Sequence, residues 1–374
     1  MGEFLTEDGA REIVDKYMTL ERVFNSTQEI LDSGPVSRLR GYKVKPGKVS
    51  DSVFGGNGSY KIKNAAGKTE VVEFENPPLN TRDGIPLRIM VRTARISTHD
   101  ITRGDIPFKD QILAANHNFM RRLLAPYIGT SQFDVPGLDD NAVVIAAEDL
   151  KTIMFENVIR AYMAKSSTST SLYQHYIKGT RIFCGHLLPE GLFANGQLPY
   201  IMDTPSTKSD EHDESVSADA LIERGICTTA QYMQISRASL VSFGVVSEFL
   251  RKKGLIAVDT KTEHGINRKG EIVGQDEIWT MDSSRFWIAK DYNEQLEKFL
   301  RGEIPEVNPR SYSKEFARGM SQGDEGYTGE QRALIAVRYI MGIQQLLGTR
   351  FEPDLRSRDE RVISGLEAAV KLVA

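Results

Sequence analysis

The chain has 374 residues, enough for roughly two or three packed units, and 40% of them are hydrophobic. A formal net charge of −4 argues against a nucleic-acid binder, and two cysteines, Cys184 and Cys227, leave no disulfide framework or cysteine-based metal site. Without a membrane-length apolar run, we expect a cytoplasmic protein that binds neither nucleic acid nor membrane, and the sequence does not separate a monomer from a homodimer.

Residues 1–140 are predicted to form helices and a few strands. Apolar residues spaced by four, three and four predict one amphipathic helix over residues 7–32. Strands are expected at 71–74 and 87–91, followed by a helix over 110–127. An aspartate-rich loop at 133–140 suggests a boundary. We therefore expect an N-terminal helical extension (1–37), a small β-rich lobe (38–140) and a larger α+β body (141–374).

The second part is expected to hold two strands within 143–159, a short helix at 172–177 and one or two helices over 218–253. Further helices are predicted at 292–300, at 327–347 and from residue 359. The hydroxyl-rich run at 165–171 is either a disordered tip or a loop that closes over a phosphate.

A predicted β-hairpin at 255–276 carries an unusual group of charges. Asp259, Lys261 and Glu263 are spaced by two, so they share one face of a strand. A turn near Arg268 would place Asp276 opposite Lys261. Carboxylates and an amine on one face suit Mg²⁺ and the phosphates of a nucleotide. The alternative is a solvated hairpin whose charges pair with each other.

Other charged segments are candidates for anion binding. Lys48 follows a glycine in a turn that could lie over a phosphate. The segment 282–285 combines a carboxylate, two hydroxyls and the guanidinium of Arg285, which suits an anionic substrate. Lys314 and Arg318 are four apart, so on a helix they form either a phosphate clamp or an exposed basic edge.

Several motifs follow one another in a fixed order from about residue 40 to 345: GKVSD, TARISTHD, IPFKDQIL, IRAY before serines, LPEGL, TPSTKSDEHDESVS, DTKTEHG, QDEIWTMDSSRFW and SYSKEFAR. In order and content they resemble the SAICAR synthetase (phosphoribosylaminoimidazole-succinocarboxamide synthase) family of purine biosynthesis. The chain departs from the family pattern at four positions, where Ala94 replaces Asp, Ala161 and Lys165 replace Gly, and Met281 replaces Pro.

The resemblance implies a fold related to the ATP-grasp enzymes, with ATP between the small lobe and the larger body. It also implies the ligation of L-aspartate to carboxyaminoimidazole ribotide (CAIR), with ATP converted to ADP and phosphate. Mg²⁺ would be held by Glu263 and Asp276, and ATP phosphates by Lys48 and Lys261. The remaining assigned residues, which would hold the ribotide or aspartate, are Arg160, Ser166, Lys208, Asp213, Arg285, Lys314 and Arg318. Lys261, Glu263, Asp276 and Lys208 are the expected catalytic residues.

Two alternatives remain open. The chain could be another ATP-using enzyme of the same fold, such as an inositol-phosphate kinase, which would phosphorylate a hydroxyl and need no aspartate. It could also be a catalytically silent relative with a binding role. The TPSTKSDEHDESVS segment favours the ligase over the kinase, and the retained Lys261, Glu263, Asp276 and Arg285 favour an active enzyme.

Overall fold

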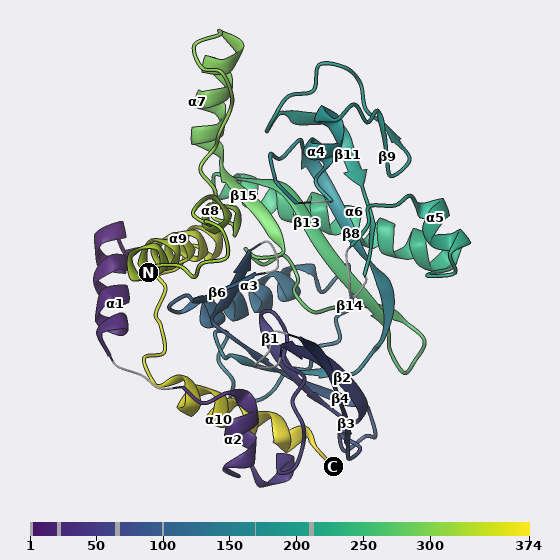
Figure 1. The fold of residues 1–374 in the computed structure, drawn as a ribbon, viewed down its shortest axis with the longest axis vertical. Coiled ribbons are helices and arrows are strands. Elements are labelled where there is room, and N and C mark those ends of the chain that lie inside the picture. Colours follow the sequence, from purple (N-terminus) through teal and green to yellow (C-terminus); the bar gives the residue numbers. More distant parts are fainter. Residues whose placement is uncertain (1–2, 21–23, 64–67, 99–100, 169, 209–212) are drawn as a thin grey trace.

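The computed structural model describes residues 3–20, 24–63, 68–98, 101–168, 170–208 and 213–374. Helices and strands are mixed along the chain, which confirms the predicted α+β class. A larger sheet occupies the upper part of Figure 1 and a smaller sheet the lower part. Two of the sequence motifs lie partly outside the described residues, at 99–100 and 209–212.

The larger sheet is built around β13 (Leu255–Ile266), with the strand order β11-β8-β13-β14. The apolar start of β13 is buried, as its sequence predicts, and the hairpin with β14 (Ile272–Gln275) is confirmed. β13 also pairs along most of its length with β8 (Lys151–Tyr162) and at its start with β15 (Ser284–Ile288). The charged strand is therefore central in a sheet, and its polar residues are shielded on both sides.

The smaller sheet has the order β1-β4-β7 and comprises β1 (Ser50–Phe54), β4 (Leu87–Arg92) and β7 (Val144–Glu148). Leu87, Ile89 and Val91 alternate along β4 and enter one core. The helices α2 (Thr27–Asp32) and α10 (Arg358–Ala369) contribute to the same core and lie together at the bottom of Figure 1. Two helices far apart in the sequence thus meet beneath the smaller sheet, whereas the N-terminus lies beside α9.

The remaining strands form hairpins or edges. β2 (Gly56–Lys63) pairs with β3 (Thr69–Asn76), β5 (Arg95–Thr98) with β6 (Ile101–Asp105), and β9 (Ile182–Phe183) with β10 (His186–Leu187). β11 (Gln197–Asp203) and β12 (Ser206–Thr207) both pair with β8.

Helices cover the sheets and connect them. The longest, α6 (Thr229–Lys252), packs on β13 and β8, and α3 (Lys109–Leu124) and α9 (Gly329–Leu347) join it in the main core. The others are α1 (Glu7–Thr19), α4 (Leu172–Ile177), α5 (Ala218–Glu223), α7 (Ala289–Leu300) and α8 (Glu315–Gly319), with single 3₁₀ turns at Ser37–Leu39 and Val370–Leu372. No helix in the described ranges is both long and apolar enough to cross a bilayer.

The single helix predicted over 7–32 is wrong. α1 packs on α9, whereas α2 is a separate helix in the core of the smaller sheet. Ser26 starts α2 with a capping box, in which its hydroxyl accepts from the amide of Glu29 while the Glu29 carboxylate accepts from the amide of Ser26. This cap begins a new helix at Thr27, so the apolar residues on either side of it belong to different helices and do not share one helix face.

Candidate active site

Four charged side chains meet on β8, β13 and the end of β12, and we call them the carboxylate–lysine cluster: Glu156, Lys208, Lys261 and Glu263. Lys208 contacts one carboxylate oxygen of Glu263, and Lys261 lies 3.5 Å from the other. Lys261 also contacts Glu156, which lies directly across from Glu263 in the register of β8 and β13. Two partly exposed lysines therefore cover two buried carboxylates.

The electrostatics of this cluster follow from burial and pairing. Burial alone would raise the pKa of Glu263, but the attraction of Lys261 and Lys208 outweighs it and lowers the pKa to about 2. Burial opposes the charge of Lys261, yet Glu156 and Glu263 raise its pKa above the usual value. Burial and the neighbouring Glu263 raise the pKa of Glu156, although Lys261 opposes this. The two lysines therefore favour the charged form of Glu263 more strongly than that of Glu156.

Asp276 lies beside this cluster, but the predicted pairing with Lys261 is wrong. β14 ends at Gln275, which pairs with Glu263, and Asp276 then takes a left-handed backbone conformation with φ of 58°. This conformation is uncommon for a residue other than glycine and turns the chain out of the sheet. Burial and repulsion from Glu263 raise the pKa of Asp276. The two carboxylates are close enough to repel, so a bound cation would stabilise both.

This pair suits Mg²⁺, which takes one or two carboxylates and completes its coordination with phosphate oxygens and water. In the described part of the chain, no three or more His, Cys, Asp and Glu side chains form an all-protein metal site. Glu263 and Asp276 therefore match a metal held jointly by protein and nucleotide, and they do not match a permanent structural metal.

Three arginines and two carboxylates form a second group, the arginine cluster: Arg160, Asp259, Arg285, Glu315 and Arg318. Asp259 lies 2.9 Å from Arg285 and 3.6 Å from Arg160. Glu315 lies 3.5 Å from Arg285 and 2.9 Å from Arg318. Three guanidinium groups against two carboxylates leave an excess of positive charge, which suits an anionic ligand.

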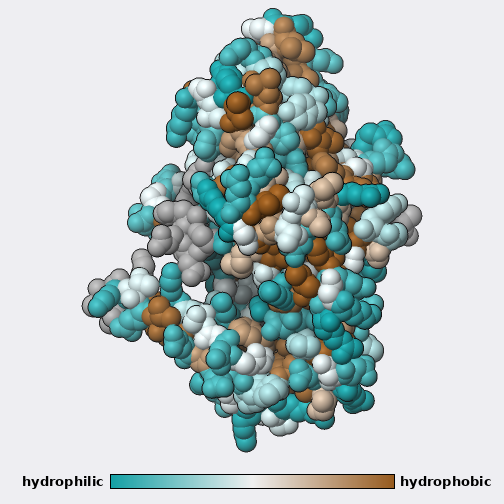
Figure 2. All heavy atoms as spheres, turned by 90° about the vertical axis from the view of Figure 1, so that its right-hand side faces the viewer, coloured by the Kyte–Doolittle hydropathy of each residue, from teal (hydrophilic) through white to brown (hydrophobic). Residues whose placement is uncertain are grey.

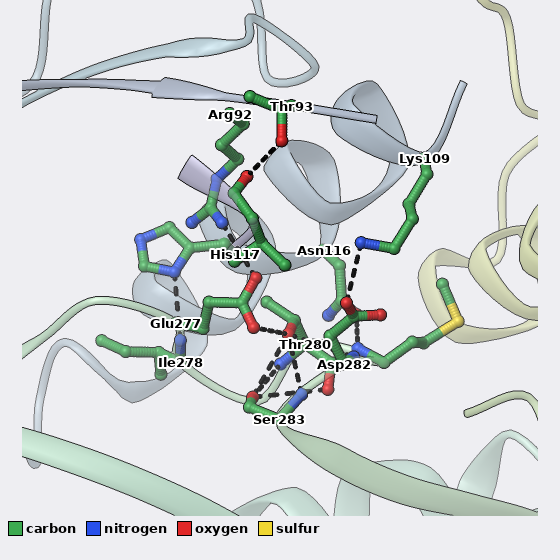
Figure 3. Close-up of polar contacts among 12 residues, drawn as sticks. Arg92, Thr93, Lys109, Asn116, His117, Glu277, Ile278, Thr280, Asp282 and Ser283 are labelled. Carbon is green, nitrogen blue, oxygen red and sulfur yellow. Dashed lines mark hydrogen bonds and ion pairs between the residues drawn. The ribbon is translucent and has the colours of Figure 1, made fainter. Parts of the chain in front are cut away.

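The segment from Glu277 to Ser283 joins the two sheets, as Figure 3 shows. Arg92 of β4 lies 3.1 Å from Glu277, so the smaller sheet pairs directly with this segment. From α3, Asn116 donates to the carbonyl of Trp279 and accepts from the amide of Met281, and His117 accepts from the amide of Ile278. These contacts hold the backbone between Asp276 and Arg285 in one conformation.

Asp282 lies at the end of that segment. The fully buried Lys109 lies 2.7 Å from its carboxylate, and Lys314 lies 4.0 Å from it. Tyr339 donates a hydrogen bond to the same carboxylate. Burial lowers the pKa of Lys314 to about 8, although Asp282 opposes this. Lys314 therefore carries its charge at neutral pH but loses it under mildly alkaline conditions.

The other predicted residues lie in different surroundings. Lys48 lies in the exposed turn before β1 and outside both clusters. Ser166 is buried in the loop after β8, where its hydroxyl lies 3.4 Å from that of Thr168. This loop is anchored to the arginine cluster, because Arg160 donates to the carbonyl of Thr170. Asp213 is exposed, but its charge contributes to the raised pKa of Glu156.

A groove of about 800 Å³ lies elsewhere, between the start of β8 and the connection from α5 to α6. Its lining is mostly apolar and includes Ile153, Met154, Ile222, Ile226, Cys227 and Ile266. Figure 2 views the side of the molecule that carries α5 and shows apolar atoms gathered across its middle. Such a lining does not suit a phosphate, so we place the candidate active site at the charged clusters.

Comparison with known proteins identifies the family of this chain. A family model described as SAICAR synthetase matches residues 81–333, which is more than half of the chain. The chain belongs to the SAICAR synthetase family. The match contains all the predicted site residues except Lys48.

Relatives with this name align over much of the chain. It is 36% identical over 230 residues to the chloroplastic phosphoribosylaminoimidazole-succinocarboxamide synthase of Arabidopsis thaliana, covering 62% of this chain and 53% of that protein. The chain thus spans about half the length of that relative. It is 33% identical over 296 residues to the synthase of Cytophaga hutchinsonii, covering 75% of this chain and 90% of that protein.

The fold is that of a SAICAR synthase. The structure of the Saccharomyces cerevisiae enzyme, solved in complex with SAICAR, superposes with a TM-score of 0.64 at 21% identity. The superposition covers 88% of this chain and 99% of that one.

Sequence reasoning missed several residues of this SAICAR synthetase family site. Glu156 was detectable, because it is the one carboxylate in β8 and directly follows the apolar run Ile153, Met154 and Phe155. Arg92 directly follows the strand predicted at 87–91, and it ends the observed strand β4. Lys109 belongs to a family motif, but nothing in its local sequence shows that it is fully buried against Asp282.

Proposed function

We propose that this protein joins L-aspartate to the carboxylate of CAIR, with ATP converted to ADP and phosphate and SAICAR as the product. The single observation that carries the proposal is the Glu263 carboxylate held between Lys208 and Lys261 beside Asp276, in a chain of the SAICAR synthetase family. In this arrangement the two amines would neutralise the charge of a nucleotide's phosphates, and the two carboxylates would hold Mg²⁺.

The reaction requires activation of a carboxylate, which resists attack by an amine. A CAIR carboxylate oxygen attacks the γ-phosphorus of ATP, the bond to the β-phosphate oxygen breaks, and ADP leaves. The amine of aspartate then attacks the carbonyl carbon of the acyl phosphate, phosphate leaves, and the nitrogen loses its proton to give an amide. The protein's part in both steps is to position the reactants and stabilise charge.

We assign ATP to the space between the two sheets, in a fold related to ATP-grasp. The Arg92–Glu277 contact supports this, because it brings the smaller sheet to the segment that follows Asp276. Lys261 and Lys48 would contact the phosphates. Glu263 and Asp276 would hold Mg²⁺, which neutralises phosphate charge when bound.

The arginine cluster is assigned to the ribotide. Arg160, Arg285 and Arg318 supply more positive charge than Asp259 and Glu315 neutralise. Ser166 lies on the loop that Arg160 anchors, and Lys314 adds an amine next to Asp282. For L-aspartate, Lys208 and Asp213 offer one charge of each sign, as its carboxylates and amine require.

The test is ADP release with Mg-ATP and the carboxylated ribotide, with and without L-aspartate. Release that needs all three and yields the succinocarboxamide supports the proposal. Release onto a hydroxyl acceptor without aspartate would favour a kinase-like enzyme, and ATP binding without any turnover would favour a silent relative. Omitting Mg²⁺ should abolish release, and restoring it should recover the rate.

A further inference from the structure

A chain of hydrogen bonds begins in the terminal helices, which lie outside the part of the chain that matches the family model. Arg358 of α10 donates to the carbonyl of Asn25 at 2.6 Å and to the hydroxyl of Thr27 at 3.3 Å. The Thr27 hydroxyl in turn donates to Asp51 of β1 at 2.7 Å. Thr27 and Asp51 are buried, with 1% and 4% of their surface exposed. The C-terminal helix is thus connected to the first strand of the smaller sheet.

Asp51 is linked through Arg95 to the turn that carries Lys48. The other oxygen of Asp51 accepts from Arg95 of β5, and the same nitrogen of Arg95 donates to the carbonyl of Gly47 at 2.8 Å. Gly47 makes a tight turn, because a Cβ there would lie 2.2 Å from the carbonyl oxygen of Ser50. Asp51 therefore orients the side chain that holds this turn.

Arg95 also reaches the substrate side of the site. Its carbonyl accepts from the amine of Lys109 at 3.1 Å, and Lys109 lies 2.7 Å from Asp282. One residue thus joins the Lys48 turn, through its side chain, to the Glu277–Ser283 segment, through its main chain. Arg95 therefore helps to set the positions of both the Lys48 turn and the Glu277–Ser283 segment.

We propose that Asp51 is a positioning residue for ATP, which acts through Arg95 on the Lys48 turn and is itself held by Thr27 and Arg358. The proposal rests on the assignment of Lys48 to ATP phosphates. It gives the terminal helices, which the family model does not cover, a part in nucleotide binding. In this proposal Asp51, Thr27 and Arg358 act through Arg95 and the Lys48 turn and need no contact with the nucleotide.

Thr27 offers the sharpest test, because it is remote from the site and has close isosteres. Thr27→Val keeps the shape but removes the hydroxyl, so Asp51 loses a donor and Arg358 an acceptor, whereas Thr27→Ser keeps the hydroxyl. Thr81→Val is the matched control, since Thr81 is a buried threonine near the same sheet whose hydroxyl accepts from the amide of Ile85. The dissociation constant of ATP is measured by calorimetry, together with KM for ATP, CAIR and aspartate.

We expect Thr27→Val to weaken ATP binding and raise KM for ATP about fivefold, the effect of losing the one hydrogen bond that Asp51 accepts from Thr27, with KM for CAIR and aspartate unchanged. Thr27→Ser should restore the wild-type values, and Thr81→Val should not change them. Equal changes in all three KM values, or the same effect in Thr81→Val, would show that the contacts are merely structural and overturn the proposal. Unchanged ATP binding in Thr27→Val would also overturn it.

Asp51→Asn provides an independent test of the proposal if Thr27→Val folds poorly. The amide of this variant keeps one acceptor but cannot form an ion pair with Arg95, so ATP binding should weaken more than in Thr27→Val. A wild-type protein that binds ATP but makes no succinocarboxamide would contradict the proposed function and leave the ATP-binding test of Asp51 intact. Asp51→Asn with wild-type ATP affinity would contradict the positioning role alone.

Discussion

Glu156 and Glu263 lie directly opposite each other on neighbouring strands, and the amine of Lys261 contacts both carboxylates. Like charges at directly paired positions of a sheet are destabilising, and burial strengthens the effect. The pKa of Glu263 is lowered because two lysines contact it, whereas burial and Glu263 raise the pKa of Glu156. The two carboxylates have different roles: Glu263 is the candidate ligand, and Glu156 sets the position of Lys261.

Glu156→Gln should lower kcat roughly tenfold or more, because supporting residues of metal and phosphate sites typically contribute that much. The amide cannot form an ion pair with Lys261, so the lysine is no longer fixed for the phosphates. Steady-state ADP release is the measurement. Glu297→Gln, on the exposed surface of α7, is the control and should retain full activity. Wild-type kcat in Glu156→Gln would contradict this role.

Glu263→Gln should abolish Mg-ATP turnover, with a loss of at least about a hundredfold, while the fold stays intact. The substitution removes the charge that pairs with Lys208 and Lys261 and one of the two proposed Mg²⁺ ligands. ADP release and circular dichroism are measured together. Near-normal turnover would contradict the assignment of Glu263 to Mg²⁺. Loss of the circular dichroism signal would show that the charge of Glu263 is needed for folding.

Arg285→Ala should weaken ribotide binding far more than ATP binding, since Arg285 lies in the arginine cluster and contacts Asp259 and Glu315. We expect KM for CAIR to rise about tenfold or more, the cost of a lost charge-assisted contact. Arg310→Ala changes an exposed arginine nearby and should alter neither KM. An equal fall in ATP affinity would mean that Arg285 has been assigned to the wrong substrate.

The affinity for CAIR should fall as the pH rises through about 8. The pKa of Lys314 is lowered to about 8, so the amine is charged and can bind an anion below that pH and is neutral above it. KM for CAIR is measured from about pH 6.5 to 9.5, on either side of this pKa. KM for CAIR should rise across this range in the wild type. In Lys314→Arg this rise in KM should disappear, because a guanidinium stays protonated. A rise of the same size in Lys314→Arg would assign the titration to another group.

Asp110→Asn should destabilise the fold by about 3–5 kcal/mol, the typical cost of removing one partner of a buried ion pair. Asp110 at the start of α3 lies 2.8 Å from Arg361 of α10, and both side chains are at most 5% exposed. Urea unfolding gives the change in free energy. Asp134→Asn removes an exposed carboxylate from its pair with Arg121 and should cost less than about 1 kcal/mol. Equal effects would mean that burial does not strengthen the Asp110 pair.

The sequence predicted the parts of the site that depend on local spacing. Lys261 and Glu263 are two apart on one strand, so their common position follows from the period of a β-strand. Asp276 was misplaced, because a register count assumes that the strand continues, whereas the backbone leaves the sheet after Gln275. Such a turn is fixed by contacts of the following residues with Arg92 and α3, which no local pattern contains.

Partners far apart in the chain were beyond local reasoning. Glu156 and Lys261 belong to strands whose pairing depends on the whole topology of the sheet, and the same holds for Lys109 and Asp282. The division of the first helix, by contrast, was detectable. Ser26 and Glu29 have the spacing of a capping box, and that signal should have outweighed the apolar periodicity.

The packing of α10 against the smaller sheet has a consequence for synthesis on the ribosome. β1 and β4 are made early, but Val362 and Leu366 of α10 belong to the same core. Until residues 358–369 emerge from the exit tunnel, the apolar face of this sheet lacks its cover. The strands that carry Asp51 and Arg92 therefore reach their final packing only after α10 has been translated, long after the strands themselves.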